Sequence, residues 1–355
     1  MSMARPAAAA FVCAACWLAA GASGAEGAPA AAPEGGAGIA ARYAGDAGIA
    51  RDPEVLFVED FEEGSLEAVS KRWTETKNPK GEVLALSDDV PPGSPGKKSL
   101  AMTSTKGQNT GGHLWKLFKP GVDEMYGRFC VKFSKGHPYV HHFVKIGAWK
   151  DSPNWPQGEA GKKHDGARSF QTGIEPGSGY GRNDPPGAWF LYTYWQGMKS
   201  WQGPQGTSFY GNAFAPAKPA QVPRDQWQCV EFMVKANSAP EKSDGEQAFW
   251  VDGKLVGRWA PGTPAGRWVK DRFVAGEGAP FEGFQWRSAD DLKINTFWLL
   301  YYMDSVFKGD AQFKPKAGVA YNADGGTVWF DHVVVARKYL GPLRAAEQPP
   351  APKAE

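Results

Sequence analysis

The chain has 355 residues, which is enough for one large β domain or two domains of ordinary size. Its 40 Lys and Arg residues and 38 Asp and Glu residues give a formal net charge of +2, which argues against a nucleic-acid-binding protein. Beyond the N-terminal segment the sequence has no run of about 18 apolar residues, so we predict no membrane-spanning helix. The 15 tryptophans fit either a sugar-binding surface or the core of a β-sandwich.

Both ends of the chain differ in composition from the middle. Residues 1–25 predict a secretory signal peptide, with Arg5 before an apolar stretch and small residues at Ala22–Ala25 for cleavage. We therefore expect a secreted or periplasmic protein. The remaining predicted segments are a disordered linker over 26–52, one β domain over 53–343 and a disordered tail over 344–355.

Cleavage of the signal peptide would remove two of the four cysteines, Cys13 and Cys16. A lipoprotein anchor at Cys16 is the alternative, although Cys13 is unusual three residues before such a site. The remaining pair, Cys130 and Cys229, can form a disulfide in an exported protein.

Short alternating apolar segments recur through the middle of the chain, separated by clusters of Gly, Pro, Asp and Asn. This pattern predicts an all-β sandwich or jelly roll, because helical periodicity is nearly absent. Asp252-Gly253 predicts the tight turn of a hairpin. The predicted strands are Val55–Phe61, Ser99–Thr103, His113–Phe118, Tyr126–Phe133, Val140–Ala148, Phe170–Glu175, Trp189–Tyr194, Gln228–Lys235, Gln247–Val251, Ile294–Tyr302 and Val328–Ala336.

Successive side chains of a strand point to opposite faces, so the two strands that hold the cysteines can be oriented. Arg128 and Cys130 fall on the polar face of one strand, and Cys229 and Glu231 on the polar face of the other. If these strands pair side by side, the cysteines come close enough for a disulfide. Two separate thiols are the alternative.

The segment around His141 and His142 is the first candidate for chemistry. Alternation places His141 and Lys145 on an open face, and His142 on the core face with Val144 and Ile146. His142 is therefore expected to be an interior histidine, and His141 a candidate catalytic group.

The connection from Ala148 to Ser169 is long, polar and rich in Gly and Pro, which is typical of a functional lid or of disorder. Lys162, Lys163, His164 and Arg168 make it basic. A basic lid beside an aromatic groove suits an anionic polysaccharide, and a solvated cluster of charges is the alternative reading.

Two further strands carry polar groups on one face. Gln171 and Glu175 share the face opposite the core, where Glu175 is a candidate acid, base or sugar ligand. A solvated carboxylate at the end of a strand is the alternative for Glu175. Asn295 begins a strand and could reach a substrate or satisfy nearby backbone groups.

The most informative strand is WFLYTYW, Trp189 to Trp195. Alternation places Tyr192 and Tyr194 together on the open face, away from Trp189 and Leu191. A phenol can stack on a sugar ring, donate a hydrogen bond or transfer a proton. The pair therefore predicts a carbohydrate site.

Metal ligands are sparse. Glu59, Asp60 and Asp331 fall near the first and last strands, but they are too few to predict a calcium site, although a structural calcium is left open. We predict no cofactor.

Several segments resemble the family-14 polysaccharide lyases and, less closely, the glucuronan lyases. They are Gly111–Lys116, Tyr126–Phe133, Phe143–Gly147 with its lysine, Tyr192–Tyr194 with its tyrosine pair, and the closing strand VWFDHVVVA. The resemblance implies a concanavalin A-like β-jelly-roll sandwich of two antiparallel sheets with a concave substrate groove. It also implies a monomer that cleaves an anionic, uronate-containing polysaccharide, such as alginate or glucuronan, by β-elimination.

One departure concerns the strand before the tyrosine pair, where the family pattern has an arginine. Here that strand carries Glu175 instead. A uronate would then be neutralised by Lys145, Arg168, Arg182 or His141.

In the mechanism that the resemblance implies, Tyr194 is the base or acid, Tyr192 is its partner or a stacking platform, and His141 is the competing base. Lys145 and Arg168 are the expected neutralisers. The alternatives are a non-catalytic carbohydrate-binding protein and a glycoside hydrolase that uses Glu175.

Overall fold

The computed structural model describes residues 37–150, 160–203 and 206–346. The predicted signal peptide, the first part of the predicted linker and the end of the predicted tail lie outside these residues. No helix within the described ranges is long and apolar enough to cross a membrane.

The first sheet has eight strands, in the order β16-β15-β14-β6-β21-β4-β3, with β1 beside β21. Its strands pair antiparallel throughout. The bounds are β1 Val55–Glu59, β3 Leu84–Ser87, β4 Ser99–Thr105, β6 Glu124–Phe133, β14 Gln228–Lys235, β15 Glu246–Val251, β16 Lys254–Trp259 and β21 Gly325–Ala336.

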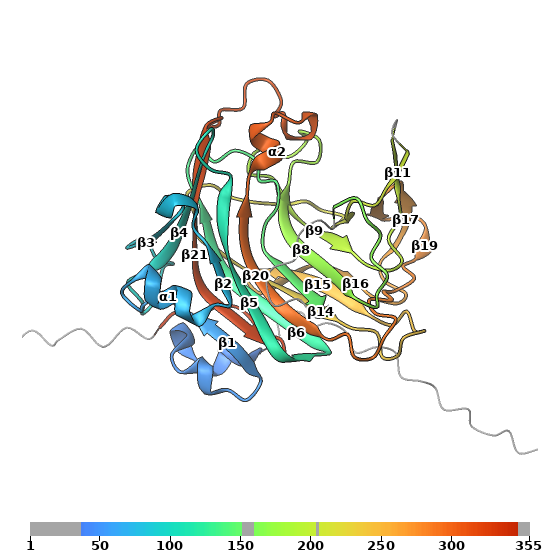
Figure 1. The fold of residues 1–355 in the computed structure, drawn as a ribbon, viewed down its shortest axis with the longest axis horizontal. Helices are drawn as coiled ribbons and strands as arrows, with labels where there is room; N and C mark the ends of the chain where they lie inside the picture. Colours follow the sequence, from blue (N-terminus) through green and yellow to red (C-terminus); the bar gives the residue numbers. More distant parts are fainter. Residues whose placement is uncertain (1–36, 151–159, 204–205, 347–355) are drawn as a thin grey trace, which may run out of the picture. The chain divides into compact units, whose positions relative to one another are not determined.

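The second sheet has eleven strands, in the order β19-β17-β18-β12-β9-β8-β7-β20-β5-β2, with β13 beside β9. Figure 1 shows β5, β20, β8 and β9 in the middle of this layer, and β17 and β19 at one side. The bounds are β2 Glu75–Lys77, β5 Gly111–Val122, β7 Lys145–Trp149, β8 Ser169–Gly177, β9 Ala188–Tyr194, β12 Asn212–Ala215, β13 Ala220–Gln221, β17 Ala265–Val269, β18 Arg272–Ala275, β19 Ala279–Pro280 and β20 Ile294–Tyr302.

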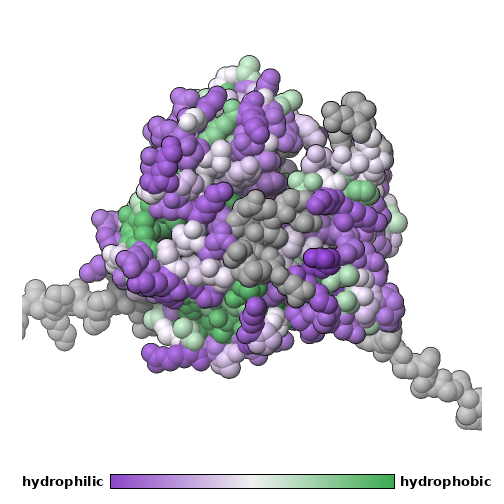
Figure 2. All heavy atoms as spheres, in the orientation of Figure 1, coloured by the Kyte–Doolittle hydropathy of each residue, from purple (hydrophilic) through white to green (hydrophobic). Residues whose placement is uncertain are grey.

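The two sheets form the β-sandwich jelly roll that the sequence predicts, with one difference: β12 and β18 run parallel. Short helices and a separate hairpin complete the described chain. They are α1 Leu66–Arg72, α2 Asp304–Phe307, the 3-10 helices η1 Ile39–Arg42, η2 Ala44–Asp46, η3 Ile49–Arg51, η4 Pro79–Gly81 and η5 Ala311–Phe313, and the pair β10 Trp201–Gly203 and β11 Gly206–Ser208. On the face drawn in Figure 2, hydrophilic side chains surround smaller hydrophobic areas.

The main hydrophobic core lies between the sheets and follows strand alternation. Phe129 of β6 and Phe330 of β21 meet Phe143 from the segment before β7, with ring centroids 6.1 and 5.3 Å from Phe143. The hairpin prediction is also confirmed, because β15 and β16 pair around a turn in which Asp252 and Gly253 both have positive φ.

A second apolar cluster covers the outer face of the first sheet. Ile39, Ala40 and Ile49 pack there against residues such as Trp250 and Leu340. The prediction of a disordered linker is therefore wrong for residues 37–52, which form three 3-10 helices. Such short turns need only a few apolar side chains, so they leave no periodic signal in the sequence.

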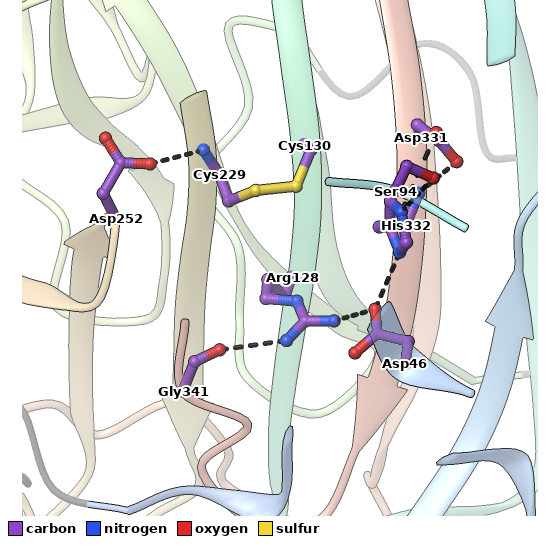
Figure 3. The surroundings of a disulfide bond; sticks show 9 residues. All are labelled: Asp46, Ser94, Arg128, Cys130, Cys229, Asp252, Asp331, His332 and Gly341. Carbon is purple, nitrogen blue, oxygen red and sulfur yellow. Dashed lines mark hydrogen bonds and ion pairs between the residues drawn. A yellow bond between two sulfur atoms is a disulfide. The ribbon is translucent and has the colours of Figure 1, made fainter. Parts of the chain in front are cut away.

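This cover also buries the polar face of β6 and β14. Arg128 is 1% exposed and Glu231 is 3% exposed. Arg128 donates to the carboxylate of Asp46 and to the carbonyl of Gly341 (Figure 3), and Glu231 accepts from the backbone N–H groups of Leu340 and Gly341. Both charges are buried because segments from the two ends of the described chain supply partners for them.

The predicted cysteine pair is confirmed as a disulfide. Cys130 of β6 lies directly opposite Cys229 of β14, with Cα atoms 3.9 Å apart (Figure 3). The bond closes a loop of 99 residues, which includes the strands β7, β8 and β9.

We predict that the double substitution Cys130→Ala/Cys229→Ala lowers the free energy of unfolding by about 2–5 kcal/mol, because it frees this long loop in the unfolded chain. Denaturant titrations of both proteins would measure the difference. A reducing agent should bring the wild type close to the variant and leave the variant unchanged. A difference below about 1 kcal/mol would contradict the prediction.

Candidate functional site

A row of side chains crosses the second sheet on the face opposite the core. Trp298 of β20 lies opposite Lys145 of β7, which lies opposite Gly173 of β8, which lies opposite Tyr192 of β9. The neighbours of these residues along each strand, such as Ile146, belong to the core. Strand parity therefore places Lys145 and Tyr192 on one open face, as the sequence predicts.

Glu175 comes from β8, two residues beyond Gly173 on the same face. A Cβ atom added at Gly173 would lie 3.2 Å from Oε1 of Glu175 and 3.2 Å from Cγ of Lys145. The two charged side chains thus converge in the space that the glycine leaves open. The Lys145 ammonium also lies 5.5 Å from the centre of the Trp298 ring, in a cation–π contact.

His142 belongs to this group, and its prediction as a core residue is wrong. Its Nδ1 lies 2.9 Å from Oε1 of Glu175, and its side chain is 23% exposed. Alternation fails here because β7 begins only at Lys145, while Phe143 and Val144 both enter the core. His142 instead forms an isolated bridge with Tyr302 of β20, which turns its ring toward the open face.

His141 lies beside the cluster rather than at its centre. Its ring stacks on His142 at 4.1 Å and on Tyr302 at 5.2 Å, and its Nδ1 accepts a hydrogen bond from the N–H of Ser305 at 3.4 Å. Burial, together with neighbouring His142, lowers the pKa of His141 to about 3.

Burial shifts the pKa values of the three central groups. It lowers the pKa of His142 well below the ordinary value, and the charge of Lys145 adds to this effect. It raises the pKa of Glu175 to about 7, although Lys145 and His141 oppose the rise. The pKa of Lys145 is lowered by burial, while Glu175 favours the ammonium form. At neutral pH the cluster therefore holds a neutral imidazole beside a carboxyl group near its titration point.

The two tyrosines differ in access. Tyr192 is half-buried, and its hydroxyl accepts a hydrogen bond from the N–H of Gly211 at 2.9 Å. Tyr194 is only 5% exposed, with its ring 5.5 Å from that of Tyr192 and 5.2 Å from that of His164. Burial raises the pKa of both phenols, for Tyr192 well above the ordinary value. Both rings lie on the predicted face, but only Tyr192 is half-open.

Of the other predicted site residues, Gln171 lies in register with Tyr194 on the same face and is 8% exposed. Arg168 and Arg182 are exposed, and Arg182 donates to the carbonyl of Gly179 at 2.8 Å. Asn295 bonds the backbone of Trp149 through both its amide oxygen and its amide nitrogen, at 3.0 Å each. Of the two roles left open for Asn295, the geometry therefore fits the one in which its side chain bonds nearby backbone groups.

Sequence reasoning missed His142 and Tyr302 as members of the cluster. No periodic signal could have found them, because both act where the regular strands end. The pair of adjacent histidines was the available signal, since two polar rings in an apolar segment need polar partners.

Two of the acidic groups near β1 have donors of the protein as partners. Oxygen atoms of Glu59, Asp60 and Glu63 lie within 4.8 Å of one another. Arg72 pairs with Glu63 and lies 3.5 Å from Glu59, and the indole N–H of Trp73 donates to Glu59 at 2.9 Å. Arg72 and Trp73 therefore already occupy oxygen atoms of Glu59 and Glu63, and we assign no metal ion to this group.

A second polar group lies under the outer cover (Figure 3). His332 places Nδ1 3.0 Å from Asp46 and Nε2 2.8 Å from the hydroxyl of Ser94, which is the connectivity of a hydrolase triad. The adjoining pocket is, however, lined by the carboxylates of Asp331 and Glu62, among others. The carboxylate of Glu62 also accepts hydrogen bonds from the backbone N–H groups of residues 97 and 98. Negative charge would oppose an oxyanion there, so we interpret the group as structural.

Comparisons with known proteins bear on the fold. No family model matches the sequence, and no curated protein is similar to it. Among solved structures, an alginate lyase from Chlorella virus matches with a TM-score of 0.50 and 14% identity, over 80% of this chain and 99% of that one. An endo-β-1,4-glucuronan lyase from the fungus Trichoderma reesei matches with a TM-score of 0.43 and 16% identity, over 82% and 100%. The chain is thus similar in fold to jelly-roll polysaccharide lyases.

Proposed function

We propose that the protein cleaves a uronate-containing polysaccharide by β-elimination on the open face of the second sheet. The observation that carries the proposal is the convergence of Lys145, Glu175, His142 and Tyr192 beside one another. β-Elimination needs a cation for the uronate carboxylate, a base for the C5 proton and an acid for the leaving oxygen. These residues supply one group for each task.

His142 is the proposed base. When Glu175 is ionised, its carboxylate accepts the Nδ1–H of His142 at 2.9 Å, which leaves a lone pair on Nε2. The same carboxylate stabilises the imidazolium that forms when Nε2 takes the proton. This revises the roles expected from the sequence, since His142 is hydrogen-bonded to Glu175, whereas the Nδ1 of His141 accepts from Ser305.

Lys145 and Tyr192 complete the reaction. The Lys145 ammonium neutralises the uronate carboxylate, so that negative charge can develop on it when Nε2 of His142 removes the C5 proton. The electron pair then forms the C4–C5 double bond and expels the glycosidic oxygen at C4. Tyr192 donates its hydroxyl proton to that oxygen, and its raised pKa keeps the phenol protonated before the transfer.

We predict that Lys145→Ala, His142→Ala and Tyr192→Phe each lower turnover by on the order of 10²-fold or more. The assay is the near-ultraviolet absorbance of unsaturated uronate products on a panel of alginate, glucuronan, pectin and glycosaminoglycans. Tyr194→Phe should have a smaller effect than Tyr192→Phe, and Tyr321→Phe, at an exposed tyrosine, should have none.

Each alternative function has its own result in this assay. Binding without cleavage would indicate a carbohydrate-binding protein. New reducing ends that form without the absorbance would indicate a glycoside hydrolase, if their formation is lost in Glu175→Gln. If turnover falls more in Tyr194→Phe than in Tyr192→Phe, Tyr194 is the acid or base and Tyr192 its partner, as the sequence suggested.

The pH dependence follows from Glu175, whose pKa burial raises to about 7. Below this pH the protonated carboxyl donates to Nδ1 of His142, so the imidazole hydrogen moves to Nε2 and the base is lost. We therefore expect kcat/KM to fall about tenfold per pH unit below about pH 7. Glu175→Gln should have a lower kcat/KM than the wild type. Its kcat/KM should no longer fall as the pH decreases below about 7. A wild-type rate that rises as the pH falls through 7 would contradict the assignment.

We also propose that the protein is exported after cleavage of residues 1–25, on the basis of their composition. Mass spectrometry of the mature protein should find an N-terminus between about Gly24 and Pro33. Secreted or periplasmic material that retains Met1 would rule this out.

A further inference from the structure

The row that contains Lys145 and Tyr192 continues toward the β17–β19 edge of the sheet. Tyr192 lies opposite Ala213 of β12, and Ala213 lies opposite Arg272 of β18. The next residues along these two strands, Phe214 and Phe273, belong to the core. Arg272 therefore lies on the same open face as the proposed catalytic groups.

Long and small side chains alternate along this row. Gly173 separates Lys145 from Tyr192, and Ala213 separates Tyr192 from Arg272. The small residues leave room above the sheet between the functional side chains. Since neighbouring strands lie about 4.8 Å apart, Lys145 and Arg272 are separated by about 19 Å along the sheet. That is the length of several sugar units rather than one.

Arg272 is held by a cation–π contact. Its guanidinium carbon lies 5.5 Å from the centre of the Tyr180 ring, and this ring is 67% exposed. Stacking fixes the plane of the guanidinium and leaves its N–H edge available, which is the geometry that binds a carboxylate with two hydrogen bonds. By contrast, Arg258 and Arg287 are already paired with Glu246 and Asp123. The described residues include no such carboxylate for Arg272.

Four of the five most exposed large hydrophobic side chains lie near this end of the row. The large hydrophobic residues that stand most open in the described chain are Tyr180, Tyr210, Val269, Val274 and Tyr321. Val269 pairs with Arg272, Val274 follows it on the same face, and Tyr180 stacks on it. Tyr210 precedes Gly211, whose N–H bonds Tyr192. Exposed apolar surface of this kind around a cation suits the rings and carboxylates of a polysaccharide.

We propose that Arg272 and Tyr180 form a distal subsite, which binds a second uronate carboxylate of the same polysaccharide chain that Lys145 engages. The proposal rests on the proposed function and deepens it. It implies that the substrate is a polysaccharide segment several sugars long, with uronate carboxylates at two places along it. Arg272 adds affinity only when a substrate spans the row from Lys145. Short oligosaccharides that end before Arg272 gain nothing from it.

The test measures binding by calorimetry in a His142→Ala background, in which cleavage is blocked and Lys145 is kept. The probes are trisaccharides and hexasaccharides of mannuronate and of glucuronate. Arg272→Ala should weaken binding of the hexasaccharide about tenfold, as expected for one lost charge-assisted contact, and leave the trisaccharide unchanged. Arg272→Lys keeps the charge but loses the planar stack on Tyr180. Its affinity for the hexasaccharide should lie between those of Arg272 and Arg272→Ala. Arg51→Ala removes an exposed arginine on the cover of the other sheet and should change neither affinity.

If Arg272→Ala in the His142→Ala background binds the hexasaccharide as tightly as His142→Ala alone, the proposed subsite is wrong, even if the wild type cleaves polysaccharide. An equal loss for both lengths would also overturn it, because Arg272 would then lie within reach of a short ligand. If the wild type neither binds nor cleaves any of the probes or polymers, the proposed function fails, and the subsite fails with it.

Discussion

Lys145 and Glu175 are buried close together and interact electrostatically, and the arrangement of the open face depends on these two residues. Either charge alone would be strongly unfavourable at 7% and 4% exposure. Their meeting requires the register of β7 with β8 and the absence of a side chain at Gly173. The carboxyl group of Glu175 also lies 2.9 Å from Nδ1 of His142, so Glu175 couples the electrostatics of Lys145 and His142.

The outer face of the first sheet solves the same physical problem differently. Arg128 and Glu231 lie in register there, and their charges are matched by Asp46 and by backbone groups at residues 340 and 341. That cluster is sealed by the chain itself, with exposures of 1% and 3%. On the second sheet the side chain of His142 remains 23% exposed. Two buried ionic groups therefore have different uses, one in holding the chain segments together and one beside an accessible surface.

Much of this fold could be predicted from the sequence, because most of its strands are regular. Parity alone placed Lys145, Glu175, Tyr192 and Tyr194 on one face and each cysteine on the polar face of its strand, while the register that pairs the cysteines comes from the structure. It failed where the chain leaves regular geometry. His142 precedes the first residue of β7, so its side chain does not alternate with Val144.

The other failures have the same kind of cause. Asn295 lies at a register shift in β20, where its amide completes the bonding of Trp149. The access of Tyr194 depends on His164, which lies thirty positions away in the chain and contacts it only after folding. The 3-10 helices of residues 37–52 bury single side chains rather than a stripe. Alternation predicts the faces of strands, but it does not predict what covers them.

The cover has a consequence for the order of events during synthesis. The N–H groups of Ile39 and Ala40 donate to the carbonyls of Tyr339 and Leu340, and that of Gly45 donates to Arg344. The first described segment is thus bonded to the last, so these three hydrogen bonds can form only after residues 339–344 have been synthesised. At a synthesis rate of about 5–20 residues per second, residues 339–344 follow the early segment by tens of seconds, whereas its partners Arg128 and Trp250 are made sooner. Closure of the outer layer by these three bonds is therefore a late step in folding.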